Sequence, residues 1–280
     1  MTILLRHFRL AVLLAVGACA LATIGSDGAI AQDIGGFDLN QPDAPIVIEA
    51  EQGIEWRRDE QVYIASGNAM VARGDISVHA DLLKAYYRGD GTSASEIYRV
   101  EATGNVRMVS PGRTVYGEYA VYDVERRVLV VTGGNLKVET ATEIVTAKDS
   151  LEYWQAEMVV VARGDAQVVQ PDSGRNVRAE TLTGFFRENS EGKVVLYQVE
   201  AAGNVRIERG DQVARAAKAV YNLDNEVATL TGGVKITQGQ NQLNGDSAEF
   251  NLRTGVSRLM GSGTSEGRVQ TLIVPGSSPP

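Results

Sequence analysis

Residues 98–108 read YRVEATGNVRM and residues 197–207 read YQVEAAGNVRI, so one stretch occurs twice with a shift of 99 positions. The same shift pairs Tyr122 with Tyr221 and Gly133 with Gly232. An upstream stretch, residues 65–71, has its counterpart at residues 162–168. The chain is therefore a tandem duplication.

A shorter unit repeats within each copy. An aromatic residue precedes a glycine by eleven positions four times, and the glycines at 104 and 133, 203 and 232, and 232 and 261 are each 29 positions apart. Most of these glycines are followed by an apolar, polar, apolar triplet such as Val106-Arg107-Met108. Periods of about 20 to 50 residues are typical of stacked repeats, in which one unit cannot bury its own apolar face.

Short segments with alternating polarity and many β-branched residues begin at residue 45 and continue to residue 274, separated by turn residues. Residues 211–221 are rich in alanine and fit a helix on propensity alone. Their counterpart, residues 112–122, contains Thr, Val and Tyr side chains that favour a strand. Because two aligned copies share a fold, the sequence predicts strands at both places and an all-β protein.

Strand alternation also predicts which side chains face inward. The middle residue of each triplet is Arg or Lys, which is too costly to bury unpaired and so faces water. The flanking apolar residues then point to the interior. The same rule places three further pairs on the inner face, namely Tyr122 with Val124, Tyr221 with Leu223, and Phe250 with Leu252. Periodicity leaves open whether this apolar seam is a closed core or an open trough.

The ends of the chain have a different composition. Residues 1–31 are typical of an export signal, with Arg6 and Arg9 before an apolar run and the small-residue pattern Ala29-Ile30-Ala31 before cleavage. Cys19 offers a minor alternative, a lipoprotein anchor. Residues 32–44 are expected to form a flexible leader and residues 276–280 an unfolded tail. These features predict a mature protein outside the cytoplasm.

Composition argues against several functions. The net charge is −8, and phosphate binding needs clustered positive charge, so nucleic acid is not expected as a partner. Cleavage after Ala31 leaves no cysteine and only His79 as histidine. The sequence therefore predicts no metal site, no cofactor and no catalytic residue. His79 is expected on a strand surface. Trp56 and Trp154 are expected in the core, with a position at an end or edge as the alternative.

At this point the sequence resembles a known family. Residues 45–51 (PIVIEAE), the Gly-Asn-Val units, residues 230–234 (LTGGV) and residues 268–275 (RVQTLIVP) together resemble the OstA-like, LptA-type periplasmic proteins of lipopolysaccharide export. The resemblance implies an elongated, V-shaped β-jellyroll of two facing antiparallel sheets, here built from repeats of about 30 residues. It divides the chain into one jellyroll repeat at residues 45–161 and a second, stacked on the first, at residues 162–275.

The resemblance also implies a function. Such a protein holds the lipid A acyl chains of lipopolysaccharide in an apolar groove, associates head to tail, and bridges an inner-membrane LptC-like and an outer-membrane LptD-like jellyroll protein. The residues expected to line the groove are Ile46, Ile48, Val62, Ile64, Val106, Met108, Tyr122, Val124, Val205, Ile207, Tyr221, Leu223, Val234, Ile236, Phe250 and Leu252.

Two other hypotheses fit the repeat. One is a parallel β-helix that acts on polysaccharide as an enzyme or adhesin, since that fold also stacks short strands and turns. The other is a structural periplasmic rod without a ligand. Binding of lipopolysaccharide distinguishes the transport hypothesis from both.

Overall fold

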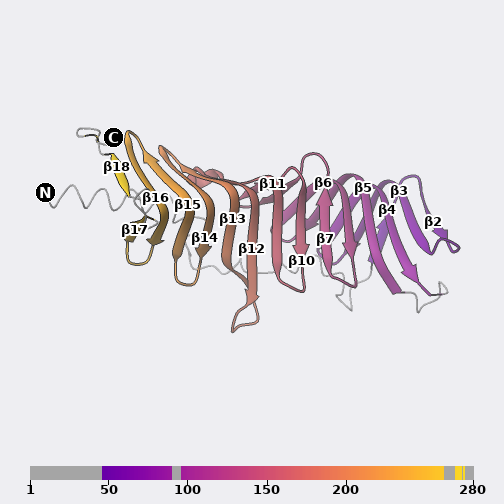
Figure 1. Ribbon diagram of the computed structural model, residues 1–280. Helices are drawn as coiled ribbons and strands as arrows, with labels where there is room; N and C mark the ends of the chain where they lie inside the picture. The colour runs from indigo at the N-terminus through magenta and orange to yellow at the C-terminus, as the bar shows by residue number, and fades with distance from the viewer. Residues whose placement is uncertain (1–45, 90–95, 262–268, 273, 275–280) are drawn as a thin grey trace. The chain divides into compact units, whose positions relative to one another are not determined.

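Antiparallel strands account for most of the described chain, as the alternating pattern predicts. The structure is a computed structural model that describes residues 46–89, 96–261, 269–272 and 274. The predicted export signal, Cys19, the leader and the tail lie outside these residues. The strands are β1 Ile46–Glu49, β2 Gly53–Arg57, β3 Val62–Arg73, β4 Ile76–Arg88, β5 Glu96–Ser110, β6 Arg113–Asp123, β7 Val128–Thr132, β8 Lys137–Thr140, β9 Ile144–Thr146, β10 Ser150–Trp154, β11 Val159–Gln170, β12 Arg175–Glu188, β13 Val194–Arg209, β14 Gln212–Asn222, β15 Val227–Gln238, β16 Asn241–Asn251, β17 Val256–Met260 and β18 Gln270–Leu272 (Figure 1).

The described residues group into two compact units. One, here called the N-terminal unit, contains residues 46–164 together with residues 188–195. The other, the C-terminal unit, contains residues 165–187 and the described residues from 196 onward. A single-turn 3-10 helix, η1 Pro171–Ser173, joins β11 to β12. The Ala-rich segment is strand β14 and its counterpart is strand β6, so both strand predictions are confirmed.

Some long strands of the N-terminal unit have two successive neighbours along one edge. The first half of β3 pairs with β2 and its second half pairs with β1. Likewise β6 pairs with β8 through residues 113–116 and with β7 through residues 119–123. The same division occurs in the C-terminal unit, where β16 pairs with β18 near its start and with β17 near its end. Each unit is thus a two-layered antiparallel β-jellyroll. The antiparallel pairing contradicts the parallel β-helix, because that fold pairs its strands in parallel.

A pair of left-handed residues marks a bulge in the middle of several long strands. In β5, Gly104 and Asn105 have φ angles of 77° and 49°, and the register with β6 shifts there between Thr103 and Val106. Two residues then face one on the neighbouring strand, which is the pattern of a β-bulge. The side-chain amide of Asn105 donates a hydrogen bond of 2.9 Å to the Asp81 carboxylate on β4.

The same corner recurs along the chain. Paired left-handed residues stand at Gly67-Asn68, Gly164-Asp165, Gly203-Asn204 and Gly232-Gly233. At the third of these the Asn204 amide donates to the Glu180 carboxylate at 2.6 Å. Glycine is required at the first position because it adopts positive φ without steric penalty. Asparagine is suited to the second position because it tolerates the left-handed conformation better than most residues. The repeated Gly-Asn motif of the sequence is therefore the corner of the jellyroll.

Replacing a corner glycine should destabilise the fold strongly. A Cβ atom at Gly104 would lie 2.2 Å from Asp81 Oδ2 in addition to being held at positive φ. The left-handed conformation costs about 1 to 2 kcal/mol for an alanine, and crowding adds about 1 kcal/mol or more. Gly104→Ala should thus lower the free energy of unfolding, measured in urea, by about 2 to 4 kcal/mol.

Gly134→Ala is the matched control, since a Cβ there has no atom within 4 Å and its φ is not positive. It should change the free energy of unfolding by less than about 0.5 kcal/mol. Equal effects of the two substitutions would show that the corner conformation does not govern stability.

Candidate functional site

Rows of apolar side chains cross the strands of the N-terminal unit. Residues paired directly across antiparallel strands lie on one face of the sheet, so the register identifies each row. One row is buried at every position from β3 to β11, and it contains Ala65, Leu83, Ala102, Ala120, Val131, Leu151 and Ala162. Two further apolar rows flank it, and all three are called the inner rows below.

The first flanking row contains the larger side chains. It crosses β5, β6, β7, β10 and β11 through Val100, Tyr122, Leu129, Tyr153 and Val160. The second lies in the other ladder and consists of Ile48, Val71, Val78, Met108, Val115, Val138 and Val145. An apolar side chain occupies every position of both rows, so apolar atoms line the inner face of both layers.

The adjacent row in the same ladder has a different character. Its members are Glu49, Met70, His79, Arg107, Tyr116, Lys137 and Thr146. Lys137 pairs with Glu139 at 2.9 Å and also lies 4.5 Å from the ring centre of Tyr116. This is the water-facing side that the triplet rule predicts.

Inner rows also cross the C-terminal unit. One contains Val199, Tyr221, Ala228, Phe250 and Ser257, the next contains Ala201, Ala219, Leu230, Ala248 and Leu259, and a third contains Ile207, Ala214, Ile236, Leu243 and Thr271. The intervening row, which includes Arg206, Arg215, Lys235 and Asn244, is polar. Both units therefore have an apolar interior and a polar outer surface.

Most residues predicted to face inward are buried. Eleven of the sixteen are buried, namely Val62, Ile64, Val106, Met108, Tyr122, Val205, Ile207, Tyr221, Val234, Ile236 and Phe250. Val124, Leu223 and Leu252 stand beyond the strand ends and are half-buried. Ile46 and Ile48 differ, because they are 51% and 44% exposed on β1. Val62 and Ile64 are buried but lie on the face opposite Ala65, because their cross-strand partners include Arg57 and Lys84, so their predicted inward direction was wrong. The inward direction of the triplets is confirmed, whereas contact with lipid stays a prediction.

Sequence reasoning missed the small residues of the interior. Ala102, Ala120, Ala201 and Ala248 are buried in the central inner rows, yet alanine is common on any surface and gives a weak signal. The cross-strand register identifies them, and the register depends on where each bulge falls. The Gly-Asn pairs are the feature of the sequence from which that register could have been worked out.

Trp56 and Trp154 are not core residues, so the prediction of core packing was wrong. They are 41% and 37% exposed and lie at the ends of strands β2 and β10. The Trp56 indole stacks on Tyr63 with 5.6 Å between ring centres and donates a hydrogen bond of 2.8 Å to the Tyr87 hydroxyl. The Arg58 guanidinium lies 4.1 Å from the Trp56 ring centre. A tryptophan at a strand end can thus satisfy both its ring and its N–H group.

His79 lies on the polar row of β4 and is half-buried. The Ser77 hydroxyl is 3.2 Å from its Nε2 atom. Burial, followed by the charge of Arg107, lowers the pKa of His79 below its ordinary value. No group of three His, Cys, Asp or Glu side chains among the described residues could hold a metal ion. Within the same part of the chain, no helix is long and apolar enough to span a membrane.

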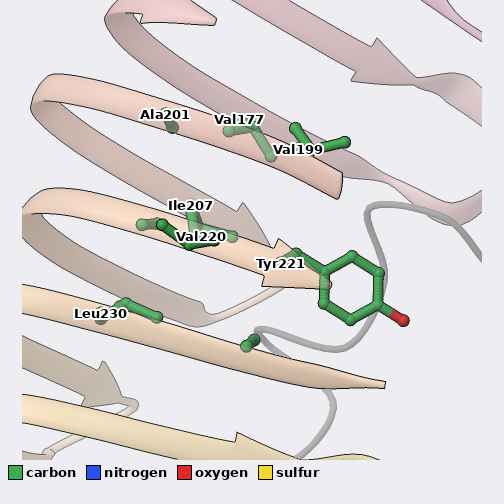
Figure 2. A pocket seen from close by; sticks show the side chains of 9 residues that line it. Val177, Val199, Ala201, Ile207, Val220, Tyr221 and Leu230 are labelled. Atoms are coloured by element: carbon green, nitrogen blue, oxygen red, sulfur yellow. The ribbon is translucent and has the colours of Figure 1, made fainter. Parts of the chain in front are cut away.

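The C-terminal unit contains a partly open apolar cavity of about 30 Å³. Its lining comes from four successive strands, β12 to β15, and consists of Val177, Val199, Ala201, Ile207, Ala219, Val220, Tyr221, Ala228 and Leu230. Figure 2 shows the side chains of Val177, Val199 and Ile207 around this space, with the Tyr221 ring beside them. A cavity of this size admits about two water-sized groups. It fits the end of a hydrocarbon chain and not a whole one.

Glu152 is the most extensively hydrogen-bonded carboxylate of the outer surface described here. It accepts hydrogen bonds from Arg163 Nε at 2.7 Å, Ser150 Oγ at 2.8 Å and Trp154 Nε1 at 3.0 Å. Burial alone would raise the pKa of Glu152, but these three donors together lower the pKa below its ordinary value. A carboxylate with a lowered folded-state pKa stabilises the fold above its unfolded-state pKa, and this stabilisation is lost as the pH falls through the folded-state pKa.

Glu152→Gln should therefore reduce stability in a pH-dependent manner. At pH 7 the loss should be about 1 to 3 kcal/mol, since a hydrogen bond to a charged group contributes that much. The difference between variant and parent should shrink as the pH falls below about 4.5, the ordinary pKa of the carboxyl group. Urea unfolding at pH 7 and pH 3 measures both values. Glu157→Gln, in the neighbouring exposed turn, should change stability by less than about 0.5 kcal/mol at either pH.

The fold and the inner rows define a class, the antiparallel β-jellyrolls with an apolar interior. The chain belongs to the family described as LptA/(LptD N-terminal domain) LPS transport protein, whose model matches twice, at residues 47–153 and 145–256. The two matches confirm the tandem duplication.

Two curated proteins and one solved structure are similar to parts of this chain. The lipopolysaccharide export system protein LptA of Haemophilus influenzae is 22% identical over 158 residues, which cover 56% of this chain and 83% of that protein. An uncharacterised protein of Rhizobium meliloti, R00383, is 27% identical over 133 residues, 45% of this chain and 70% of that protein. Among solved structures, LptH of Pseudomonas aeruginosa, described as the LptA-homologous periplasmic component of the lipopolysaccharide transport device, matches with a TM-score of 0.38 and 21% identity. That match covers 48% of this chain and 95% of LptH.

Proposed function

We propose that this protein binds lipopolysaccharide in the periplasm and shields the lipid A acyl chains between its two layers. The single observation that supports this proposal most directly is the unbroken apolar character of the inner rows, in which cross-strand partners are apolar from β1 to β9. Family membership supports lipopolysaccharide as the ligand. The export signal predicted at residues 1–31 supports a location outside the cytoplasm.

The energetics of this proposal favour contact spread along the rows. Each methylene removed from water contributes about 0.8 kcal/mol, so a chain of about twelve carbons gains about 10 kcal/mol before any cost is subtracted. A single hydrogen bond contributes only about 1 kcal/mol. Because most inner-row side chains are buried in the unliganded structure, the layers must separate to admit an acyl chain. The energy of lipid contact then offsets the loss of contact between the layers.

The terminal strands support a role in a larger assembly. Every residue of β1 and β2 is exposed, including the apolar Ile46, Ile54 and Trp56. In the C-terminal unit, β17 and β18 likewise expose Val256 and Leu272. Exposed strands accept an added strand from another chain. We propose that these strands pair with the jellyrolls of an LptC-like and an LptD-like partner, or head to tail with another copy, so that the protein bridges the two membranes.

Binding of fluorescently labelled lipopolysaccharide to the purified mature protein tests the central proposal. A saturable increase in fluorescence anisotropy, competed by unlabelled lipopolysaccharide, is the expected result. A protein that only acts as a structural rod would give no saturable binding.

The neighbouring residues Val47 and Ile48 provide a matched pair of variants. Both are exposed in β1, at 46% and 44%, so an aspartate at either position should leave the fold intact. Ile48 begins an inner row opposite Val71, whereas Val47 faces the other side opposite Ala72. Ile48→Asp should weaken lipopolysaccharide binding by about tenfold or more, which is the value of one large apolar side chain. Val47→Asp should leave binding unchanged, and equal effects would refute an inward lipid site.

A further inference from the structure

The two copies differ at several interior positions, three of which line the cavity of the C-terminal unit. Of the nine residues that line the cavity, six are identical to the residues 99 positions earlier. These are Val177, Val199, Ala201, Ala219, Val220 and Tyr221, which correspond to Val78, Val100, Ala102, Ala120, Val121 and Tyr122. Among the residues that line the cavity, the two copies therefore differ at the remaining three positions.

Ala228 accounts for the extra space. It corresponds to Leu129, so the C-terminal unit lacks most of a leucine side chain at this point. The other two differences do not add comparable room, because Ile207 replaces a methionine of similar volume and Leu230 replaces a smaller valine. The register supports the equivalence, since Leu129 pairs with Tyr122 and Ala228 pairs with Tyr221. The cavity beside Tyr221 thus occupies the place that Leu129 fills in the other unit.

The N-terminal unit is tightly filled near this position. Gly117 on β6 lies in a gap so narrow that an added Cβ would be 2.4 Å from Val131 Cγ1. Its counterpart in the C-terminal unit is Ala216, which is buried without difficulty. At this position the N-terminal unit has no room for a Cβ atom that the C-terminal unit accommodates.

We infer that Ala228 makes the C-terminal unit the place where the methyl end of a hydrocarbon chain is held. This inference rests on the proposed function. Leu129 blocks the corresponding site in the N-terminal unit, where a chain can only lie along the inner rows. The cavity favours apolar groups over water, because its lining is aliphatic and aromatic and offers water almost no polar partner. The two copies are therefore unequal in their contact with lipid.

A photoreactive fatty acid tests this inference. The probe is a twelve-carbon fatty acid with a diazirine at its methyl end, crosslinked by light to the mature protein, and mass spectrometry then locates the label. In the parent protein the label should fall in β14 and β15 around residues 219–230. Ala228→Leu should reduce this labelling by about tenfold or more, because the space for two or more carbon atoms is lost.

The reverse change should create the missing site. Leu129→Ala should add label around residues 120–131, at the corresponding place in the N-terminal unit. Thr229→Val, on the outward side of β15 beside Ala228, is the control and should leave the labelling pattern unchanged. Equal labelling of both copies in the parent protein, with no response to Ala228→Leu, would overturn the inference.

Stability measurements make the result decisive. Because a cavity is available, Ala228→Leu should melt at or above the temperature of the parent protein, and a pronounced fall in melting temperature would show that there is no room and overturn the inference. Fluorescent lipopolysaccharide distinguishes this failure from failure of the proposed function. If lipopolysaccharide binds but the label shows no preference, only the inference fails. If the parent protein binds no lipopolysaccharide, the proposed function fails, and the inference fails with it.

Discussion

The structure depends on the paired left-handed residues that form a β-bulge in the middle of several long strands. Without such a corner, a strand of 15 or 16 residues such as β5 or β13 would continue in one flat sheet. With it, the strand contributes to both layers and its apolar side chains line one interior. The Gly-Asn pair achieves this through two positive φ angles, and the carboxylate on the preceding strand holds the asparagine in place. Local backbone geometry therefore determines the two-layered arrangement of each unit.

Much of this fold could be predicted from the sequence. The Arg or Lys at the centre of each triplet fixed the outward face, and the two copies together resolved the alanine-rich segment as strand β14. The central rows of alanine could not be predicted, because their inward direction depends on the register set by the bulges. Trp56 and Trp154 were misjudged for a related reason, since an aromatic side chain near a strand end can be exposed and still have partners for its ring and N–H group.

The inward-facing side chains of the candidate site could be predicted from the sequence, but the cavity could not. The alternation of side chains along each strand identified the inward residues near the triplets, and it placed Tyr122 and Tyr221 among them. The presence of a cavity in one unit depends on the difference between Leu129 and Ala228, and such a difference has no meaning until the register shows that both face the interior. The lipid contact proposed for the apolar rows needs no specific constellation of polar groups. Hydrocarbon contact is non-directional, so a long surface of ordinary Val, Ile and Ala side chains is sufficient.

The strict alternation of inner and outer rows limits where the length of this chain can change during evolution. An insertion of one residue within a strand such as β14 would turn its apolar side chains toward water and its charged ones inward as far as the next bulge. Hairpin turns do not have this restriction, and the turn at residues 189–193 is closed by its own hydrogen bonds, in which the Asn189 side chain accepts from the backbone N–H groups of Glu191 and Lys193. Extra residues, or an epitope tag, are tolerated best at this turn.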